Sequence, residues 1–240
     1  MVSNFIKPGD KIDINLLHQN NGKIYKSSVF GFLNSQIVEI AMPTDGGKMV
    51  VFNLGVQCQL YFCTATGLYT CEAVVAQRYK KENFFLLAMK ITSEIKKFQR
   101  REFYRVECLM DFAYFHIPSE VAELETTSEL IRCLRGEEYE GQERMARTRD
   151  ISGGGIRFTA MEPLEVGQSI LVAIQLTNDK VDQMFYLVAD IMSCDLAENS
   201  DERWVVRAQF RYKDMDDRDL IIRYVFEQDR MMRKNRGGRR

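Results

Sequence analysis

The sequence predicts a mainly β protein made of two small β-barrel domains, the second of which is closed by a C-terminal α-helix. The chain of 240 residues is long enough for two domains that each bury a core of their own. Apolar and polar residues alternate in short runs along much of it, with turn residues between the runs about every 8 to 12 positions. A helical period replaces this alternation close to the C-terminus.

The first barrel is assigned to residues 1–96. Hairpin turns are expected at Gly22, at the pair Gly46 and Gly47, and at Gly67, because glycine readily takes the backbone angles that tight turns need. The strands are predicted between residue 9 and about residue 92, in KIDINLL, YKSSVFGFL, QIVEIAMP, MVVFNLG, QCQLYF, LYTCEAVVAQRY and ENFFLLAMKI.

The second domain is assigned to residues 97–240, because a polar, charged segment from Thr92 to Gln99 precedes a new apolar run. That run, REFYRVECLMDFAYFHI, is predicted to be its first strand. Residues 118–147 are acidic and partly helical in pattern, so an inserted loop or helix at the periphery is expected there. Strands resume in RTRDISGGGIRFTA, SILVAIQL, MFYLVADIMSCDL and RWVVRAQFRY, with a hairpin turn near residues 198–201.

A helix is predicted from Asp216 onward. Asp216 or Asp217 is placed to cap its N-terminus, and basic residues gather at its C-terminal end. The last six residues, NRGGRR, are expected to form a disordered basic tail. The apolar residues that recur at helical spacing are Leu220, Ile221, Tyr224, Val225, Met231 and Met232.

Composition limits the classes of function. The 33 basic and 34 acidic residues leave a net charge of −1, so no chain-wide field should attract nucleic acid or an anionic membrane, and an anion must be bound locally. The six cysteines form no CxxC pair and there are only two histidines, which argues against a metal and for a reducing compartment. Without a long apolar segment or a signal-peptide pattern, a cytoplasmic protein with no membrane span is expected.

The strongest local motif is QRREFYR, which brings Arg100, Arg101 and Arg105 together at the start of the second domain. In an extended strand, Arg101 and Arg105 project from the same face with their Cα atoms roughly 13 Å apart. Guanidinium groups suit phosphate oxygens and the O6 and N7 atoms of guanine, because both can accept two parallel hydrogen bonds from one arginine. The alternative is that these arginines are solvated strand residues that pair with Glu102 and Glu107.

A second motif, RTRDISGGGIRF, contains three consecutive glycines from Gly153 to Gly155. Such a run allows positive φ angles and the close approach of a ligand, and its N–H groups can point at an anion. Asp150 and Ser152 lie on the same side of this turn, where a carboxylate can accept from the N1–H and N2–H donors of guanine. P-loop and dinucleotide-binding spacings are absent. A β-bulge turn capped by Asp150 is the alternative.

Together, RREFYR and DISGGG resemble the RxxxR and (D/N)xSxxG motifs of the PilZ domain, the receptor module for cyclic di-GMP. The resemblance extends over about residues 97–233, although the two motifs lie further apart than in a minimal PilZ barrel. Arg157 is either a further ligand contact or a plain strand residue. The cyclic di-GMP site that the resemblance implies consists of Arg100, Arg101, Arg105, Asp150, Ser152, Gly153, Gly154 and Gly155.

The N-terminal half is similar to the N-terminal domain of the flagellar-brake (YcgR-like) proteins, with Pro43 after an apolar strand and the QRR junction. The two resemblances imply a receptor that binds cyclic di-GMP, changes the arrangement of its domains and regulates flagellar motility through a motor or stator component. They imply no metal, cofactor or nucleic acid. A PilZ-fold module that makes only protein contacts is the alternative. His18 and His116 have no triad-like partners, so an enzyme is not expected.

Overall fold

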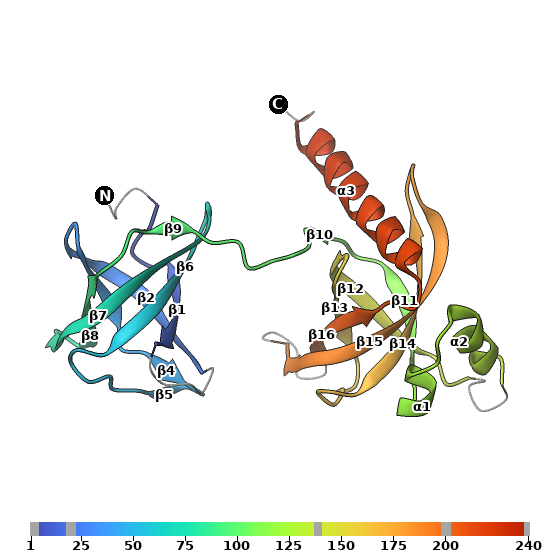
Figure 1. Cartoon of the computed structure of the whole chain (residues 1–240), viewed down its shortest axis with the longest axis horizontal. Helices are drawn as coiled ribbons and strands as arrows, with labels where there is room; N and C mark the ends of the chain where they lie inside the picture. The colour runs from blue at the N-terminus through green and yellow to red at the C-terminus, as the bar shows by residue number, and fades with distance from the viewer. Residues whose placement is uncertain (1–4, 18–22, 137–140, 198–202, 238–240) are drawn as a thin grey trace. The chain divides into compact units, whose positions relative to one another are not determined.

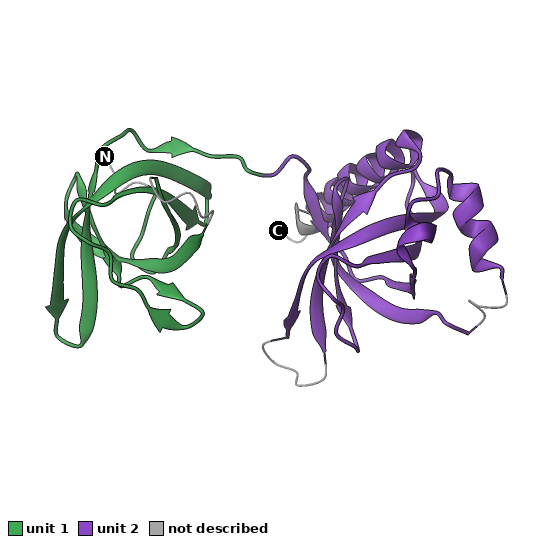
Figure 2. Ribbon diagram, turned by 60° about the horizontal axis from the view of Figure 1, so that its bottom comes forward, with its two compact units in different colours: residues 1–100 green, residues 101–240 purple. Residues whose placement is uncertain are grey.

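The computed structural model describes residues 5–17, 23–136, 141–197 and 203–237, and it divides the chain into two compact units, residues 1–100 and 101–240 (Figure 2). Each unit is a β-barrel closed by six strands, and the three helices of the described chain belong to the second unit (Figure 1). The predicted fold of two barrels and a closing helix is therefore confirmed. Within the described residues, no helix combines the length and the apolar character that a membrane crossing requires.

The described part of the first unit contains the strands β1 (Lys11–Leu16), β2 (Ile24–Asn34), β3 (Ile37–Ala41), β4 (Thr44–Asp45), β5 (Lys48–Met49), β6 (Gln57–Thr64), β7 (Gly67–Lys81), β8 (Phe84–Ile91) and β9 (Lys96–Lys97). The barrel runs in the order β1-β6-β7-β8-β3-β2, and the pairing of β2 with β1 closes it. β4 and β5 extend from β2, and β9 pairs with β7.

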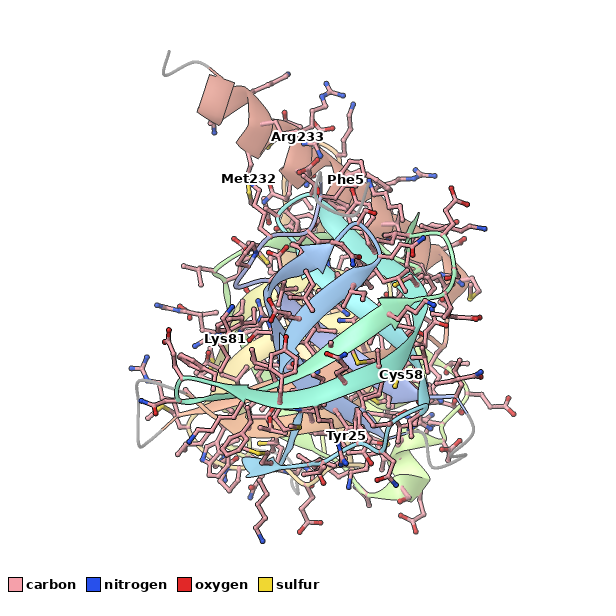
Figure 3. The ribbon with its side chains drawn as sticks, turned by 90° about the vertical axis from the view of Figure 1, so that its left-hand side faces the viewer. Phe5, Tyr25, Cys58, Lys81, Met232 and Arg233 are labelled. Atoms are coloured by element: carbon pink, nitrogen blue, oxygen red, sulfur yellow. The ribbon has the colours of Figure 1, made fainter. Side chains whose placement is uncertain are left out.

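Alternation along the strands forms the first core. In β6, Cys58 and Leu60 are fully buried and face inward, while Gln59 between them is partly exposed. Figure 3 labels Cys58 together with Tyr25 and Lys81 of the same unit. The turn predicted at Gly67 is confirmed, since its φ of 135° lies in a region that other residues avoid. The turn predicted at Gly22 lies outside the described residues.

The second unit contains the strands β10 (Arg105–Glu107), β11 (Asp111–His116), β12 (Arg144–Ser152), β13 (Gly155–Ala160), β14 (Ser169–Thr177), β15 (Asp182–Leu196) and β16 (Trp204–Arg211). Its barrel runs in the order β12-β11-β14-β15-β16-β13 and closes between β13 and β12. β10 pairs with β12 along the same edge as β11. The hairpin turn predicted near residues 198–201 lies outside the described residues.

REFYRVECLMDFAYFHI does not form the single strand that its pattern predicts. Residues 108–110 separate β10 from β11, and the side chain of buried Thr148 occupies this break. Its Oγ1 donates to the carbonyl of Cys108 at 2.8 Å and accepts from the N–H of Met110 at 2.9 Å. A side chain from the neighbouring strand thus satisfies backbone groups that a continuous ladder would have paired.

Two short helices, α1 (Ser119–Ala122) and α2 (Thr127–Leu134), occupy part of the segment expected to be an insertion. A reciprocal capping box between Thr126 and Glu129 begins α2. Leu130 of α2 and Ala122 of α1 pack against a small apolar cluster that includes Leu171 of β14. The helices therefore cover the outer side of the barrel.

The C-terminal helix, α3 (Met215–Gly237), packs Ile221, Tyr224 and Val225 into the second core. Its N-terminus is capped by Asp214 and not by Asp216 or Asp217 as predicted, because the Asp214 carboxylate accepts from the N–H of Asp216 at 2.9 Å. The first three residues of the predicted disordered tail continue this helix to Gly237. Met232 and Arg233, labelled in Figure 3, lie near its end.

Candidate functional site

The two sequence motifs meet on the outer face of the second barrel. Glu107 of β10 lies opposite Asp150 of β12, and Asp150 lies opposite Arg157 of β13. Arg157 in turn lies opposite Arg207 of β16. Because successive side chains of a strand point to opposite faces, this charged row points outward while its neighbours point into the core. Those core neighbours are Val106, Ile151, Ile156 and Ala208.

A parallel outward row lies two residues further along the strands. Arg105 of β10 is opposite Ser152 of β12, and Ser152 is opposite Gly155 of β13. Gly155 is opposite Gln209 of β16. The second arginine of RxxxR therefore adjoins the DISGGG turn, although about 45 residues of chain separate them.

Asp150 and Arg157 form the centre of the charged row. Arg157 Nη2 lies 2.6 Å from Asp150 Oδ2, and Asp150 is only 8% exposed. The Nε atom of Arg157 is buried and finds no acceptor among the described residues. An unsatisfied buried donor costs about 1 to 3 kcal/mol, so it is rare in folded proteins. A ligand oxygen or ring nitrogen at this place would satisfy it.

Arg105 is surrounded by positive charge. Partial burial of its guanidinium, together with repulsion from Arg101, lowers the pKa of Arg105, and Arg157 and Arg207 act in the same direction. Asp150 opposes the shift. The cluster of Arg101, Arg105, Arg157 and Arg207 is therefore a place where an anion relieves repulsion.

Arg101 reaches this cluster by a different route from the one predicted. Residues 101–104 bend and are not part of a strand, so the expected strand spacing between Arg101 and Arg105 is wrong. Phe103 explains the bend, because its ring packs against the glycine turn and lies 5.0 Å from the guanidinium carbon of Arg218 on α3. An anchored aromatic residue thus holds the two arginines together.

The predicted role of the three glycines also needs correction. None of them has a positive φ. A Cβ atom on Gly153 would lie 2.5 Å from Cγ1 of Ile222, and one on Gly154 would lie 2.7 Å from Cδ2 of Phe103. On Gly155 it would lie 2.2 Å from the carbonyl oxygen of Ala208. Glycine is required here for space, because the Phe103 ring, α3 and β16 all approach the turn closely.

Ser152 supports the same turn. Its Oγ accepts from the N–H of Gly154 at 3.3 Å and donates to the carbonyl of Gly155 at 3.2 Å. The register of β12 and β13 shifts between Thr148 and Asp150, so the irregularity lies before the glycine turn and not in the turn itself, where the alternative interpretation expected a bulge. Ser152, and not Asp150, makes these side-chain hydrogen bonds to the turn. Ser152 therefore stabilises the conformation of the glycine turn.

Arg100 lies apart from the other predicted residues in one respect: it belongs to the first unit. Its Nη1 atom is 3.3 Å from Oδ2 of Asp13 on β1. The structure thus brings Arg101, Arg105, Asp150 and Arg157 together in the second unit and pairs Arg100 with a carboxylate of the first.

Arg207 is the residue that sequence reasoning missed. Its Nη1 atom donates to Ser193 Oγ at 2.8 Å and to Asp195 Oδ2 at 3.0 Å. In the sequence it is one polar position of the run RWVVRAQFRY and carries no motif. Only the pairing of β16 with β13 places it beside Arg157.

The arrangement can bind a polyanion with hydrogen-bonding ring edges. Guanidinium groups supply forked donors, and the Asp150 carboxylate supplies an acceptor. His116 is engaged elsewhere, with its Nε2 3.1 Å from Glu162. Across the described residues, no group of three or more His, Cys, Asp or Glu side chains is placed to hold a metal ion.

Comparison with known proteins adds evidence of relatedness. Residues 7–91 match the family model described as flagellar protein YcgR, and residues 99–227 match the PilZ domain model. The structure of the inhibitor of motility MotI/DgrA from Bacillus subtilis aligns with a TM-score of 0.72 at 17% identity, over 98% of this chain and 100% of that one. YcgR from Escherichia coli, solved with c-di-GMP, aligns with a TM-score of 0.54 at 13% identity, over 97% and 89%. Among curated proteins no match is found.

Proposed function

The chain belongs to the PilZ domain family, with a first unit that matches the YcgR model, and on that premise we propose that it is a receptor for cyclic di-GMP. The observation that carries the proposal is the outward row in which Asp150, Arg157 and Arg207 lie side by side, next to Arg105. A buried, unsatisfied Nε on Arg157 points to a missing acceptor within this row. Cyclic di-GMP offers two phosphates and two guanine edges, which match these donors.

Each residue of the proposed site has a chemical part. Arg101, Arg105 and Arg207 supply forks for phosphate oxygens or for the O6 and N7 atoms of guanine. Asp150 accepts from guanine N1–H and N2–H while it orients Arg157. Ser152 and the glycines Gly153 to Gly155 form the turn at the end of β12, the strand that carries Asp150. Arg100 joins the site when it leaves Asp13.

The proposed biological role is that of an adaptor that regulates flagellar motility or a related surface behaviour, and not that of an enzyme. Relatives support this role by their names: one is an inhibitor of motility and another is a YcgR protein solved with c-di-GMP. A component of the flagellar motor or stator is the proposed protein partner. The ligand site adjoins the boundary between the units in the sequence, at Arg100 and Arg101, and the proposed effect of the ligand is a changed arrangement of the units.

Isothermal titration calorimetry with cyclic di-GMP, cyclic di-AMP and GMP tests the proposal directly. We expect binding of cyclic di-GMP that Arg105→Ala weakens by at least about tenfold, since one charge-assisted hydrogen bond contributes roughly 1.5 to 3 kcal/mol. Arg132→Ala on α2 removes the same charge away from the site and serves as the control. Absence of binding by the wild-type protein, or equal affinities for Arg105→Ala and Arg132→Ala, would refute the receptor function or this site.

A further inference from the structure

Residues 96–100, which precede the RxxxR motif, are held against the first barrel along most of their length. β9 pairs with β7, and the N–H of Phe98 donates to the carbonyl of Leu68 at 2.8 Å. The ring of Phe98 lies 5.3 Å from that of Tyr61 on β6. Two residues after Phe98, Arg100 forms an ion pair with Asp13 on β1. We call residues 96–100 the strap, and Arg100 is its last anchor to the first unit.

Asp13 is an unusual residue for the middle of a strand. It lies between the core residues Ile12 and Ile14, points outward, and is only 6% exposed. Lys26 of β2 lies directly opposite it in the register. Each carboxylate oxygen of Asp13 pairs with a different cation. Lys26 Nζ is 2.7 Å from Oδ1, and Arg100 Nη1 is 3.3 Å from Oδ2. A buried carboxylate needs such partners to stay charged.

Arg100 is the more weakly held cation of this group, because its 3.3 Å contact to Asp13 is longer than the 2.7 Å contact of Lys26. Its side chain is about half exposed and borders an open groove of about 620 Å³ that is also lined by Lys11, Ser28 and Thr44. When Arg100 leaves, Asp13 keeps the shorter contact to Lys26, so no buried charge is left without a partner. The release therefore costs little.

We propose that Asp13 is a positioning residue for the ligand site, which competes with the ligand phosphate for Arg100 and thereby weakens the affinity for cyclic di-GMP. A carboxylate and a phosphate that share one guanidinium repel each other, so the ligand must draw Arg100 away from Asp13 to use its full charge. Occupation of the site then removes the last anchor of the strap. This inference rests on the proposed function and assigns part of its control to the first barrel.

Two substitutions with opposite expected effects test the proposal by calorimetry with cyclic di-GMP. Asp13→Asn, which keeps the shape, should tighten binding about two- to fivefold, the range expected for breaking a partly exposed ion pair. Lys26→Gln removes the competing cation, strengthens the hold of Asp13 on Arg100, and should weaken binding by a similar factor. Lys26 is 67% exposed in its side chain, so this variant should fold even where Asp13→Asn does not.

Controls and a second background separate this mechanism from others. Asp45→Asn and Lys23→Gln change the same charges in an ion pair elsewhere on the first barrel and should leave the affinity unchanged. In an Arg100→Ala background, neither Asp13→Asn nor Lys26→Gln should change it. Effects that persist in that background, or that equal those of the controls, would overturn the proposal. A wild-type protein without any binding would instead refute the proposed function itself.

Discussion

Arg207 shows how strand register can place a residue from outside both motifs in the proposed site. It projects from β16 beside Arg157 and contributes to the positive surroundings of Arg105. Its bonds to Ser193 and Asp195 hold the guanidinium in place on the outer face. We regard it as a phosphate-binding residue of the proposed site, although it belongs to neither motif.

Arg207→Ala should therefore weaken the binding of cyclic di-GMP by about tenfold, or roughly 1.4 kcal/mol, because a forked donor to an anion is lost. The free energy of unfolding should change little, since Arg207 is exposed. Calorimetry and urea denaturation measure the two quantities. A variant that binds as the wild type does would remove Arg207 from the site.

Asp150→Ala tests which part of the ligand the carboxylate reads. Because the proposed contact is to the donor edge of guanine, the variant should lose its preference for cyclic di-GMP over cyclic di-AMP and keep residual affinity for both. Parallel titrations with the two nucleotides provide the ratio. Asp150 also holds Arg157 at 2.6 Å, so an equal loss for both ligands would mean that orienting Arg157 is its whole function.

At the scale of elements, the β12–β13 hairpin is the surface against which Phe103 packs. The Phe103 ring and Ile222 lie so close to Gly153 and Gly154 that an added methyl group would collide with them. The hydroxyl of Tyr212 donates to the carbonyl of Gly153 at 2.9 Å. The next aromatic residue, Tyr104, donates to Asp229 of α3 at 2.8 Å. Consecutive residues thus attach the RxxxR segment to the barrel and to the closing helix.

Gly155→Ala and Gly154→Ala should destabilise the second unit to different extents. The Gly155 variant meets a backbone carbonyl of β16 that cannot move without disturbing the sheet, so we expect a loss of about 2 to 3 kcal/mol or more. The Gly154 variant meets a side-chain ring, and a loss nearer 1 kcal/mol is expected. Urea denaturation gives both values. Combining Gly154→Ala with Phe103→Leu should recover part of the loss, and no recovery would contradict the proposed collision.

For the whole molecule, the near-zero net charge hides a division between the units. Residues 1–100 contain 12 Lys and Arg against 7 Asp and Glu, a net charge of +5, whereas residues 101–240 contain 21 against 27, a net charge of −6. At physiological salt a charge acts over about 8 Å, so each unit presents its own sign to a partner. Averaging over the chain therefore underestimates the local fields.

The proposed change of arrangement concerns the whole molecule as well. Small-angle scattering should differ between the free protein and the protein saturated with cyclic di-GMP, because the ligand draws Arg100 away from Asp13 and neutralises the arginines that follow it. The Arg105→Ala variant at the same ligand concentration is the control. Superimposable curves for the wild type, at a concentration where calorimetry shows saturation, would leave only a local change of surface.

The sequence by itself determined the two β-barrels, the closing helix and the two motifs. Strand alternation, glycine turns and helical spacing are local patterns, and each is readable within a few residues of its own position. Arg105 and Asp150 could be proposed as site residues for the same reason, because each motif lies within a few consecutive residues.

Only the tertiary structure decided how these parts meet. Arg207 joins the site through the register of β16, Thr148 divides a predicted strand in two, and Asp13 holds Arg100 on the first barrel. The glycine turn serves to receive Phe103, and not to adopt positive φ angles. Each of these contacts joins residues of different strands or segments. Their pairing is set by core packing and strand register, which a local sequence pattern does not encode.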